Sequence, residues 1–333
     1  MKRKRKEVVV ITGASAGLGR ALAREFAKRK ASIGLIARHE ERLSATRQEI
    51  EAFGGQAVIF PMDVANPDQM HAAAEVFEKE LGPIDIWINN AMVSIFSPVQ
   101  EMTAEDYRRV TEVTYLGYVY GTLEALRLMR PRNRGIIIQV GSALAYRAIP
   151  LQSAYCAAKH AVQGFTESVR SELMHDKSRI KISMVQLPAL NTPHFSWVKS
   201  RLKHKPRPVG PVFQPELIAR TIVWAAYHYR REWYIGLMTA IAIVGDKVAP
   251  SLGDWYLSTR YQDQEYDGPA DPNQPHNLYE PVGDHFEAHG AFDQEAVTRS
   301  FFIRFNQYRN WFLLPLVVIV ILILFLFHFL SSS

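Results

Sequence analysis

A glycine-rich turn close to the N-terminus constrains the fold of this chain more than any other feature. The apolar run Val8–Ile11 leads into Thr12-Gly13-Ala14-Ser15-Ala16-Gly17-Leu18-Gly19, and a helical pattern follows. Glycines at such a turn let backbone N–H groups at a helix N-terminus come close to a pyrophosphate. A glycine turn alone is a weak signal, but its place between a strand and a helix strengthens it. The segment therefore predicts a dinucleotide-binding strand–turn–helix.

The first two hundred residues alternate apolar runs with helical patterns. Helices are expected from Gly17 to about Lys30, from Thr103 onward and from Ser153 to about His175. Thr103 and Asp106 have the spacing of a capping box. The alternation is typical of a parallel sheet covered by helices, so we expect an α/β fold with a Rossmann-type doubly wound sheet. Further strands are predicted at Ser32–Ala37, Ala57–Phe60, Ile84–Asn89, Gly135–Val140, Ile180–Leu187 and Trp233–Ile235.

The end of the second predicted strand bears on the choice of cofactor. A carboxylate there would bind the ribose 2′-hydroxyl of NAD, but this chain has Ala37 and Arg38. Arg38 offers a guanidinium to a 2′-phosphate, which favours NADP(H) over NAD(H). The alternative is that Arg38 pairs on the surface with Glu40 or Glu41.

A tyrosine and a lysine four residues apart supply a candidate acid/base. Tyr155 and Lys159 lie in the predicted helix that begins at Ser153, so their side chains are stacked neighbours. An unperturbed tyrosine titrates near ~10, and a cation held beside it favours the phenolate. Ser142 follows the strand Gly135–Val140, at the carboxyl end where open α/β sheets bind ligands. Together these residues predict an active site.

These motifs together resemble the short-chain dehydrogenase/reductase family, in its single-domain form, over roughly residues 6–240. The resemblance rests on the glycine turn, the Tyr155/Lys159 pair and Gly141-Ser142. Further matches, in the family's order, are Asp63-Val64, Asn89-Asn90-Ala91, Pro188 and Thr192-Pro193.

The resemblance implies a role for each matched residue. Tyr155 would exchange a proton with the substrate oxygen, and Ser142 would hydrogen-bond that oxygen. Lys159 would bind the nicotinamide ribose and lower the pKa of the tyrosine. Cofactor contacts are implied for Thr12, Gly13, Ser15, Gly17, Leu18, Gly19, Arg38, Asp63, Val64, Asn90, Tyr155, Lys159, Pro188 and Thr192.

The chain departs from the family's pattern at two positions. Met92 stands where the family has glycine after Asn-Asn-Ala, which puts the shape of the cofactor pocket in doubt. Thr114 stands where the family has its fourth catalytic residue, an asparagine. Its hydroxyl either holds a water in a proton relay toward Lys159 or merely fills the space.

Charge and cysteine content exclude some kinds of partner. The formal net charge of +6 is modest, and much of it lies in the run from Lys2 to Lys6. That tail is either a solvated terminus or a segment attracted to anionic lipid headgroups. Nothing downstream resembles a readout motif, so no nucleic-acid partner is expected. The single Cys156 cannot form an internal disulfide, so the fold needs no oxidising compartment.

The chain ends in an apolar stretch. Trp311 to Leu330 is almost unbroken Leu, Ile, Val and Phe. A helix of this length spans about 30 Å, the thickness of a bilayer core. Arg299, Arg304 and Arg309 precede it, which favours a single-pass anchor with the large domain facing the cytoplasm. The alternative is a buried core helix, which would need a large partner surface.

The composition changes after Arg260. Residues 261–298 are rich in Asp, Gln, Pro, Gly and His, which indicates a polar linker or a meandering surface segment. Its histidines are expected to be exposed, and no metal site is predicted. The expected organisation is a basic tail at 1–6, a catalytic domain at 7–260, the linker at 261–298 and a transmembrane helix at 311–330.

The sequence thus predicts an NADP(H)-dependent oxidoreductase that interconverts an alcohol and a ketone or aldehyde. A membrane anchor favours a hydrophobic or lipid-like substrate. The basic loop between Thr192 and Pro211 is expected either to cover the substrate site or to rest on lipid headgroups. The resemblance implies a homo-oligomer. The alternative function is a membrane-anchored NADP(H)-binding scaffold or sensor with little turnover.

Overall fold

The computed structural model describes residues 5–271, 273–283 and 287–309. The chain divides into two compact units, Met1–Thr298 and Arg299–Ser333, and residues 301–309 of the second are helical. Within the described ranges no helix is long and apolar enough to cross a bilayer. The predicted transmembrane helix at 311–330 lies outside these ranges and stays a prediction.

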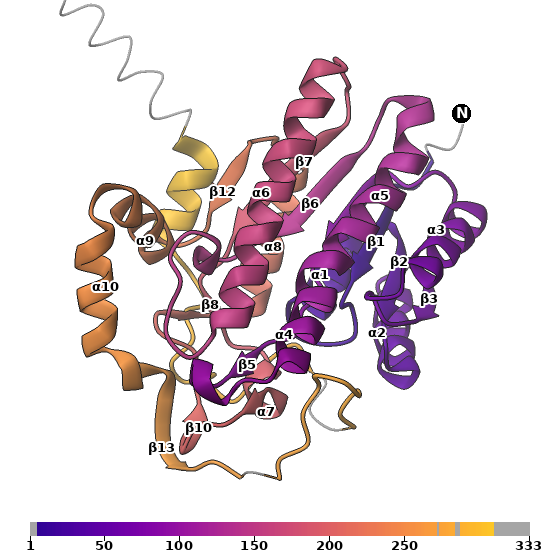
Figure 1. Ribbon diagram of the computed structural model, residues 1–333. Coiled ribbons are helices and arrows are strands. Elements are labelled where there is room, and N and C mark those ends of the chain that lie inside the picture. Colours follow the sequence, from indigo (N-terminus) through magenta and orange to yellow (C-terminus); the bar gives the residue numbers. More distant parts are fainter. Residues whose placement is uncertain (1–4, 272, 284–286, 310–333) are drawn as a thin grey trace, which may run out of the picture. The chain divides into compact units, whose positions relative to one another are not determined.

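A seven-stranded parallel sheet forms the centre of the first unit (Figure 1). The strand order is β12-β7-β6-β4-β1-β2-β3. Strands β2 and β3 are added on one side of β1 and the later strands on the other, so the order of strand addition switches between β1 and β4. All residues of β1 and β2 are buried, as expected for strands covered on both faces. The strands are β1 (Val8–Thr12), β2 (Ser32–Ala37), β3 (Gln56–Pro61), β4 (Ile86–Asn89), β6 (Ile136–Val140), β7 (Lys181–Gln186) and β12 (Glu232–Tyr234).

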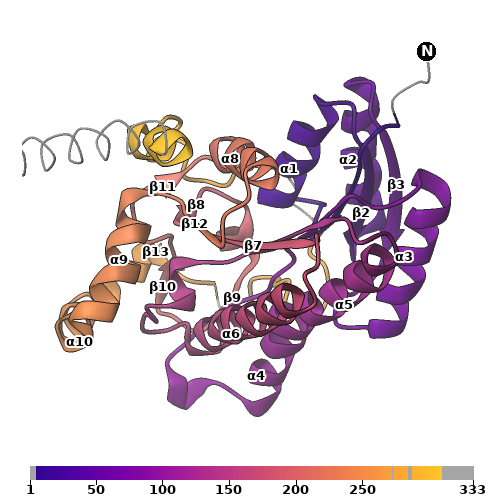
Figure 2. The same cartoon turned by 90° about the horizontal axis from the view of Figure 1, so that it is seen from above.

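Helices cover both faces of the sheet (Figure 2). One layer contains α1 (Gly17–Ala27), α2 (Glu40–Ala52) and α8 (Pro215–Tyr227). The other layer contains α3 (Pro67–Leu81), α4 (Ala104–Thr111), α5 (Gly117–Met129) and α6 (Ser153–His175), with a π-helical turn, Glu112–Leu116, joining α4 to α5.

The remaining elements lie at the carboxyl ends of the strands and beyond β12. They are β5 (Ile95–Phe96), β8 (Ala189–Leu190), α7 (His194–Trp197), β9 (Lys199–Ser200), β10 (His204–Pro206), β11 (Val212–Phe213), α9 (Leu237–Val248), α10 (Pro250–Thr259) and β13 (Glu265–Pro269).

The α/β architecture predicted from the apolar runs is confirmed. Each predicted strand of the large sheet agrees with the structure to within two residues at either end, and α6 spans the predicted Ser153–His175. The capping box at the start of α4 is also present: Thr103 Oγ1 accepts from the Asp106 N–H, and the Asp106 carboxylate accepts from the Thr103 N–H.

The segment 261–298 differs from the linker that its composition suggests. It lies in the same compact unit as the sheet, and its Leu278 is fully buried within the core. The Asn277 N–H donates to the Trp197 carbonyl, and Phe292 is buried. We call the described residues 273–283 and 287–293 the C-terminal strap. It is fixed by backbone hydrogen bonds and a few apolar side chains, and polar atoms of His276 and Asn277 are buried as well.

The basic N-terminal tail is described only from Arg5. The Arg5 guanidinium donates to Asp85 at 2.6 Å and to the Pro83 carbonyl at 2.8 Å. This end of the tail is therefore held against the loop that precedes β4.

Candidate active site

The glycine turn is fixed by a network with the end of β4. The Thr12 hydroxyl accepts from the backbone N–H groups of Asn90, at 2.9 Å, and Ala91, at 3.1 Å. The Asn90 side chain donates in return to the Thr12 carbonyl at 2.9 Å. Gly13 has φ of +68°, and a Cβ on Gly19 would lie 2.0 Å from the Gly13 carbonyl oxygen. Side chains are therefore excluded at both glycines, which leaves a backbone cradle of the kind that accepts phosphate groups.

The C-terminal strap reaches this cradle. α1 begins at Gly17, and the Gly17 N–H donates to the Glu287 carbonyl at 3.0 Å. Free N–H groups at a helix N-terminus attract anions. The Glu287 carbonyl thus satisfies a donor that the sequence assigns to the pyrophosphate.

The strap also contacts Arg38, which the sequence assigns to the 2′-phosphate. The Arg38 guanidinium donates to the backbone carbonyls of Tyr279, at 2.6 Å, and Asn277. Burial lowers the pKa of this guanidinium. Arg38 is therefore turned toward the cleft and not toward Glu40 or Glu41, the surface partners considered from the sequence.

Asp63, which the resemblance assigns to the adenine, lies in the same cluster. It forms an ion pair with Arg109, and the Arg109 Nε donates to the Leu278 carbonyl at 2.8 Å. The Arg109 guanidinium was not identified from the sequence. Arg109 projects from α4, and its guanidinium is a second positive charge close to Arg38.

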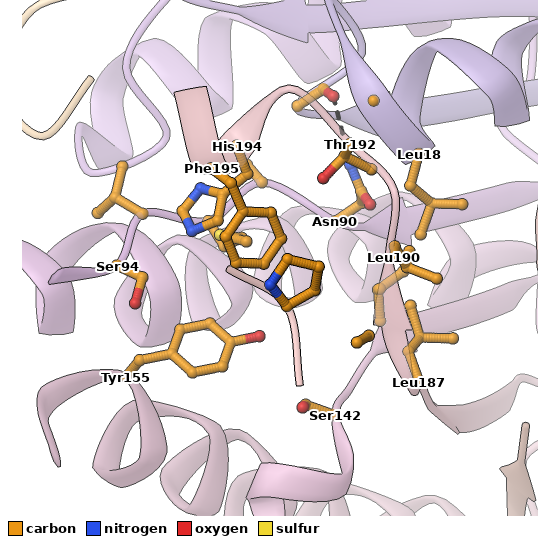
Figure 3. A pocket seen from close by; sticks show the side chains of 18 of the residues that line it. Leu18, Asn90, Ser94, Ser142, Tyr155, Leu187, Leu190, Thr192, His194 and Phe195 are labelled. Carbon is orange, nitrogen blue, oxygen red and sulfur yellow. Dashed lines mark hydrogen bonds between the residues drawn. The ribbon is translucent and has the colours of Figure 1, made fainter. Parts of the chain in front are cut away.

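Ser142 and Tyr155 lie in one cavity of about 510 Å³ (Figure 3). Ser142 follows β6, and its backbone N–H donates to the Gln186 side chain at 2.9 Å. Tyr155 projects from the first turn of α6 toward Ser142. Every residue to which the sequence assigns a cofactor contact lines the cavity except Thr12, which supports the turn from behind.

Burial dominates the electrostatics of the two titrating groups. It raises the pKa of Tyr155 above its usual range, and the hydrogen bond with Ser142 offsets this only in part. Burial lowers the pKa of Lys159 to about 7. The ammonium lies 5.6 Å from the centre of the Tyr155 ring. Burial therefore sets the pKa of Tyr155, and the lowering by Lys159 that the resemblance implies stays a prediction.

Tyr118 is the closest side-chain partner of Lys159, and no sequence motif identifies this contact. The Lys159 ammonium donates to the Tyr118 hydroxyl at 3.0 Å and to the Val140 carbonyl at 2.8 Å. The Tyr118 hydroxyl itself donates to the same carbonyl at 2.9 Å. This contact joins α5 to α6 across 41 residues, so spacing along one helix does not reveal it.

Thr114 is one turn before Tyr118, in the π-helical turn, and is fully buried. Its hydroxyl donates to the Val93 carbonyl at 2.8 Å and accepts from the Val93 N–H at 3.0 Å. Both bonds hold the chain just beyond Met92, which lines the cavity. In this arrangement Thr114 supports the backbone at Val93. Its hydroxyl proton is donated to the Val93 carbonyl and not toward Lys159.

Apolar side chains surround Tyr155 on the substrate side of the cavity (Figure 3). The ring of His194 is buried there, and burial lowers its pKa to about 4, so it is neutral at physiological pH. Most of these residues lie in short helices, short strands and loops that no sequence motif singles out. They include Val93, Phe96, Leu144, Ile149, Leu187, Leu190, Phe195 and Met238.

The loop between Thr192 and Pro211 covers the cavity, and residues 207–211 line it. Three of its Lys and Arg side chains pair with acidic residues, whereas Lys203 and Lys205 are exposed. Lys199 and Arg201 both pair with Asp106, and Arg207 pairs with Glu295. The structure places this loop against the cavity, and its role toward a substrate or toward lipid headgroups stays a prediction.

Comparisons with known proteins agree with this geometry. The family model described as short chain dehydrogenase matches residues 7–202. An uncharacterized oxidoreductase, YxnA of Bacillus subtilis, is 33% identical over 284 residues, which cover 84% of this chain and 80% of the relative. The 3-dehydrosphinganine reductase of Danio rerio is 30% identical over 226 residues, 65% of this chain and 67% of the relative.

Solved structures show the same similarity. A metagenomic short-chain oxidoreductase in complex with NADP superposes with a TM-score of 0.56 at 27% identity. The match covers 66% of this chain and 90% of that structure.

Proposed function

The chain belongs to the short-chain dehydrogenase family, and we propose that it is an NADP(H)-dependent oxidoreductase interconverting an alcohol and a ketone or aldehyde. Membership makes it an NAD(P)-dependent enzyme acting on CH–OH groups. The observation that carries the finer proposal is the placement of Tyr155 and Ser142 in the cavity lined by the glycine cradle and Arg38.

In the proposed reaction each side chain has one task. The cofactor, when bound, supplies or takes the hydride. The Tyr155 hydroxyl gives a proton to the carbonyl oxygen during reduction and takes it back during oxidation. Ser142 hydrogen-bonds the same oxygen, and Lys159 holds the nicotinamide ribose. The buried ammonium also places positive charge beneath the phenol, where negative charge develops on loss of the proton.

The proposed preference for NADP(H) rests on Arg38. Its guanidinium lies in the cavity beside the end of β2, where NAD-binding chains of this fold have a carboxylate. Arg109 lies in the same cluster. The similarity to an NADP complex supports the same choice.

The proposed substrate is hydrophobic. The lining around Tyr155 is mainly aliphatic and aromatic, so burying an apolar substrate there is favourable. The similarity to a 3-dehydrosphinganine reductase supports a lipid-like ketone. We also propose that residues 311–330 anchor the enzyme in a membrane, with the catalytic domain on the cytoplasmic side, and that the enzyme is a homo-oligomer.

The test measures NADPH and NADH oxidation with a series of ketones of increasing chain length. We expect kcat/KM to rise with chain length and to be at least about tenfold higher with NADPH. Arg38→Leu should remove that preference by raising the KM for NADPH and leaving the KM for NADH nearly unchanged. Binding of NADPH without turnover of any ketone would favour the scaffold or sensor, and equal use of both cofactors by the wild type would refute the assignment of Arg38.

A further inference from the structure

The helices α9 and α10 present an apolar face that other parts of the first unit leave uncovered. Both helices lie beyond the β12 edge of the sheet, on the side opposite β3 (Figures 1 and 2). The side chains that form the face are 51–79% exposed. We call this set the α9–α10 face: Leu237, Ile241, Val244 and Val248 from α9, and Leu252 and Trp255 from α10.

The spacing of the exposed apolar residues in α9 places them in one continuous stripe along the helix. The α9 residues recur at intervals of four, three and four, which places them on one side of the helix. The opposite side of α9 carries the buried Thr239 and Ile243. Single exposed apolar residues need no explanation, but a continuous apolar face of this kind marks an interaction surface.

The helix pair carries few charged side chains. Asp246 and Asp254 are the only acidic residues between 237 and 259. Both pair with Arg147, whose side chain is only 17% exposed. The Lys247 ammonium lies 5.1 Å from the centre of the Tyr146 ring, and Arg260, just after α10, pairs with Asp263. An exposed apolar stripe with few charges beside it is suited to burial in a lipid interface.

The α9–α10 face is continuous with the cavity that holds Tyr155. Met238 and Tyr256 are each 51% exposed at the edge of the face, and both line the cavity. Arg147 links the helix pair to the loop that carries Ser142, because its backbone N–H donates to the Ala143 carbonyl. A hydrophobic molecule leaving a bilayer at this face would enter the cavity without crossing water.

We propose that the α9–α10 face docks on a lipid bilayer and that the cavity opens toward the bilayer at Met238 and Tyr256. This surface is separate from the apolar stretch 311–330. It orients the catalytic domain on the membrane, whereas a tail alone would leave that orientation free. The entry route for substrate rests on the proposed function, but docking itself does not.

The test uses the full chain with single cysteines at Val248→Cys and Leu252→Cys, each carrying an environment-sensitive fluorophore. Met174→Cys is the matched control, because Met174 is 73% exposed at the end of α6, outside the face. The native Cys156 is buried, so labelled wild-type chain gives the background. The probe is a vesicle of phosphatidylcholine and phosphatidylserine whose acyl chains carry a nitroxide quencher.

We expect blue-shifted emission and at least about twofold quenching for both labels on the face, and neither change at Met174. Labels on the face that behave like the Met174 label would overturn the proposal. A blue shift without vesicles, unaffected by the quencher, would also overturn it. Native mass then tells whether a second copy or another segment of the same chain covers the face.

A second variant tests the entry route separately. Val248→Asp combined with Leu252→Asp should abolish docking without unfolding the chain, because both side chains are exposed. The KM for a ketone dissolved in the bilayer should then rise about tenfold, with the KM for a water-soluble ketone unchanged. Equal KM changes for both ketones would overturn the entry route. Failure of every ketone to react would refute the proposed function and leave the labelling result intact.

Discussion

The protonation of Lys159 depends strongly on the fold. Its ammonium is held by one hydroxyl and one carbonyl in a buried position, and burial lowers its pKa to about 7. The unfolded chain keeps the ordinary value of about 10.4. Between these two values the unfolded chain binds one more proton than the folded chain.

This difference predicts how stability varies with pH. A lowered folded-state pKa means that the free energy of unfolding rises as pH increases from about 7 to about 10, by at most about 5 kcal/mol. The contribution is lost as pH falls through 7. Urea unfolding of the wild type and of Lys159→Met across this range measures it, since the variant lacks the titrating group. Parallel pH curves for the two proteins would contradict the assignment.

Tyr118 is predicted to position Lys159 and not to react. Tyr118→Phe removes an acceptor from the ammonium, which disfavours the charged form and lowers the pKa of Lys159 further. If the reaction needs charged Lys159, the alkaline limb of kcat/KM against pH should move down by about one pH unit. A purely structural Tyr118 would lower stability and leave the limb where it is.

The site residues differed in how far the sequence could identify them. Ser142, Tyr155 and Lys159 form a motif with fixed spacing next to strands, so their position in one cavity followed from local patterns. Tyr118 and Arg109 contact the site through tertiary packing of α5 and α4, and no short spacing records such contacts. The rise in the pKa of Tyr155 is equally invisible in the sequence, because it depends on how deeply the phenol is buried.

At the scale of elements, the strands and the C-terminal strap show opposite behaviour. β1 and β2 are buried on both faces and therefore appear as apolar runs that a sequence reveals. The strap is polar and aperiodic, and it is held by backbone carbonyls such as those of Glu287 and Tyr279. Backbone hydrogen bonds leave no trace in composition, which is why residues 261–298 suggest a linker.

Leu278 tests whether the strap belongs to the folded unit. It is fully buried in the core, so Leu278→Ala should lower the free energy of unfolding by about 2–5 kcal/mol. Leu252→Ala is the matched control, because Leu252 is 64% exposed and its loss should cost less than about 0.5 kcal/mol. Chemical denaturation of both variants gives the comparison. Equal, small effects would mean that the strap is the linker its composition suggests.

At the scale of the whole molecule, the catalytic unit and the C-terminal stretch have separable properties. Removing residues 311–333 should convert a carbonate-resistant membrane protein into one that carbonate releases, because a helix of about 20 apolar residues is what resists extraction. Turnover of a water-soluble ketone should stay within about twofold of the full chain. Carbonate resistance that survives the deletion, or full-length protein that is extracted, would contradict the predicted anchor.

The central claim is that Tyr155 is the acid/base of an NADP(H)-dependent carbonyl and alcohol exchange. The most direct measurement compares wild type and Tyr155→Phe for NADPH binding and for NADPH oxidation with the best ketone of the series. We expect a Kd for NADPH within about threefold of wild type and a kcat lower by about 10³-fold, the usual contribution of a general acid/base. Substantial turnover by Tyr155→Phe, with NADPH binding intact, would contradict it.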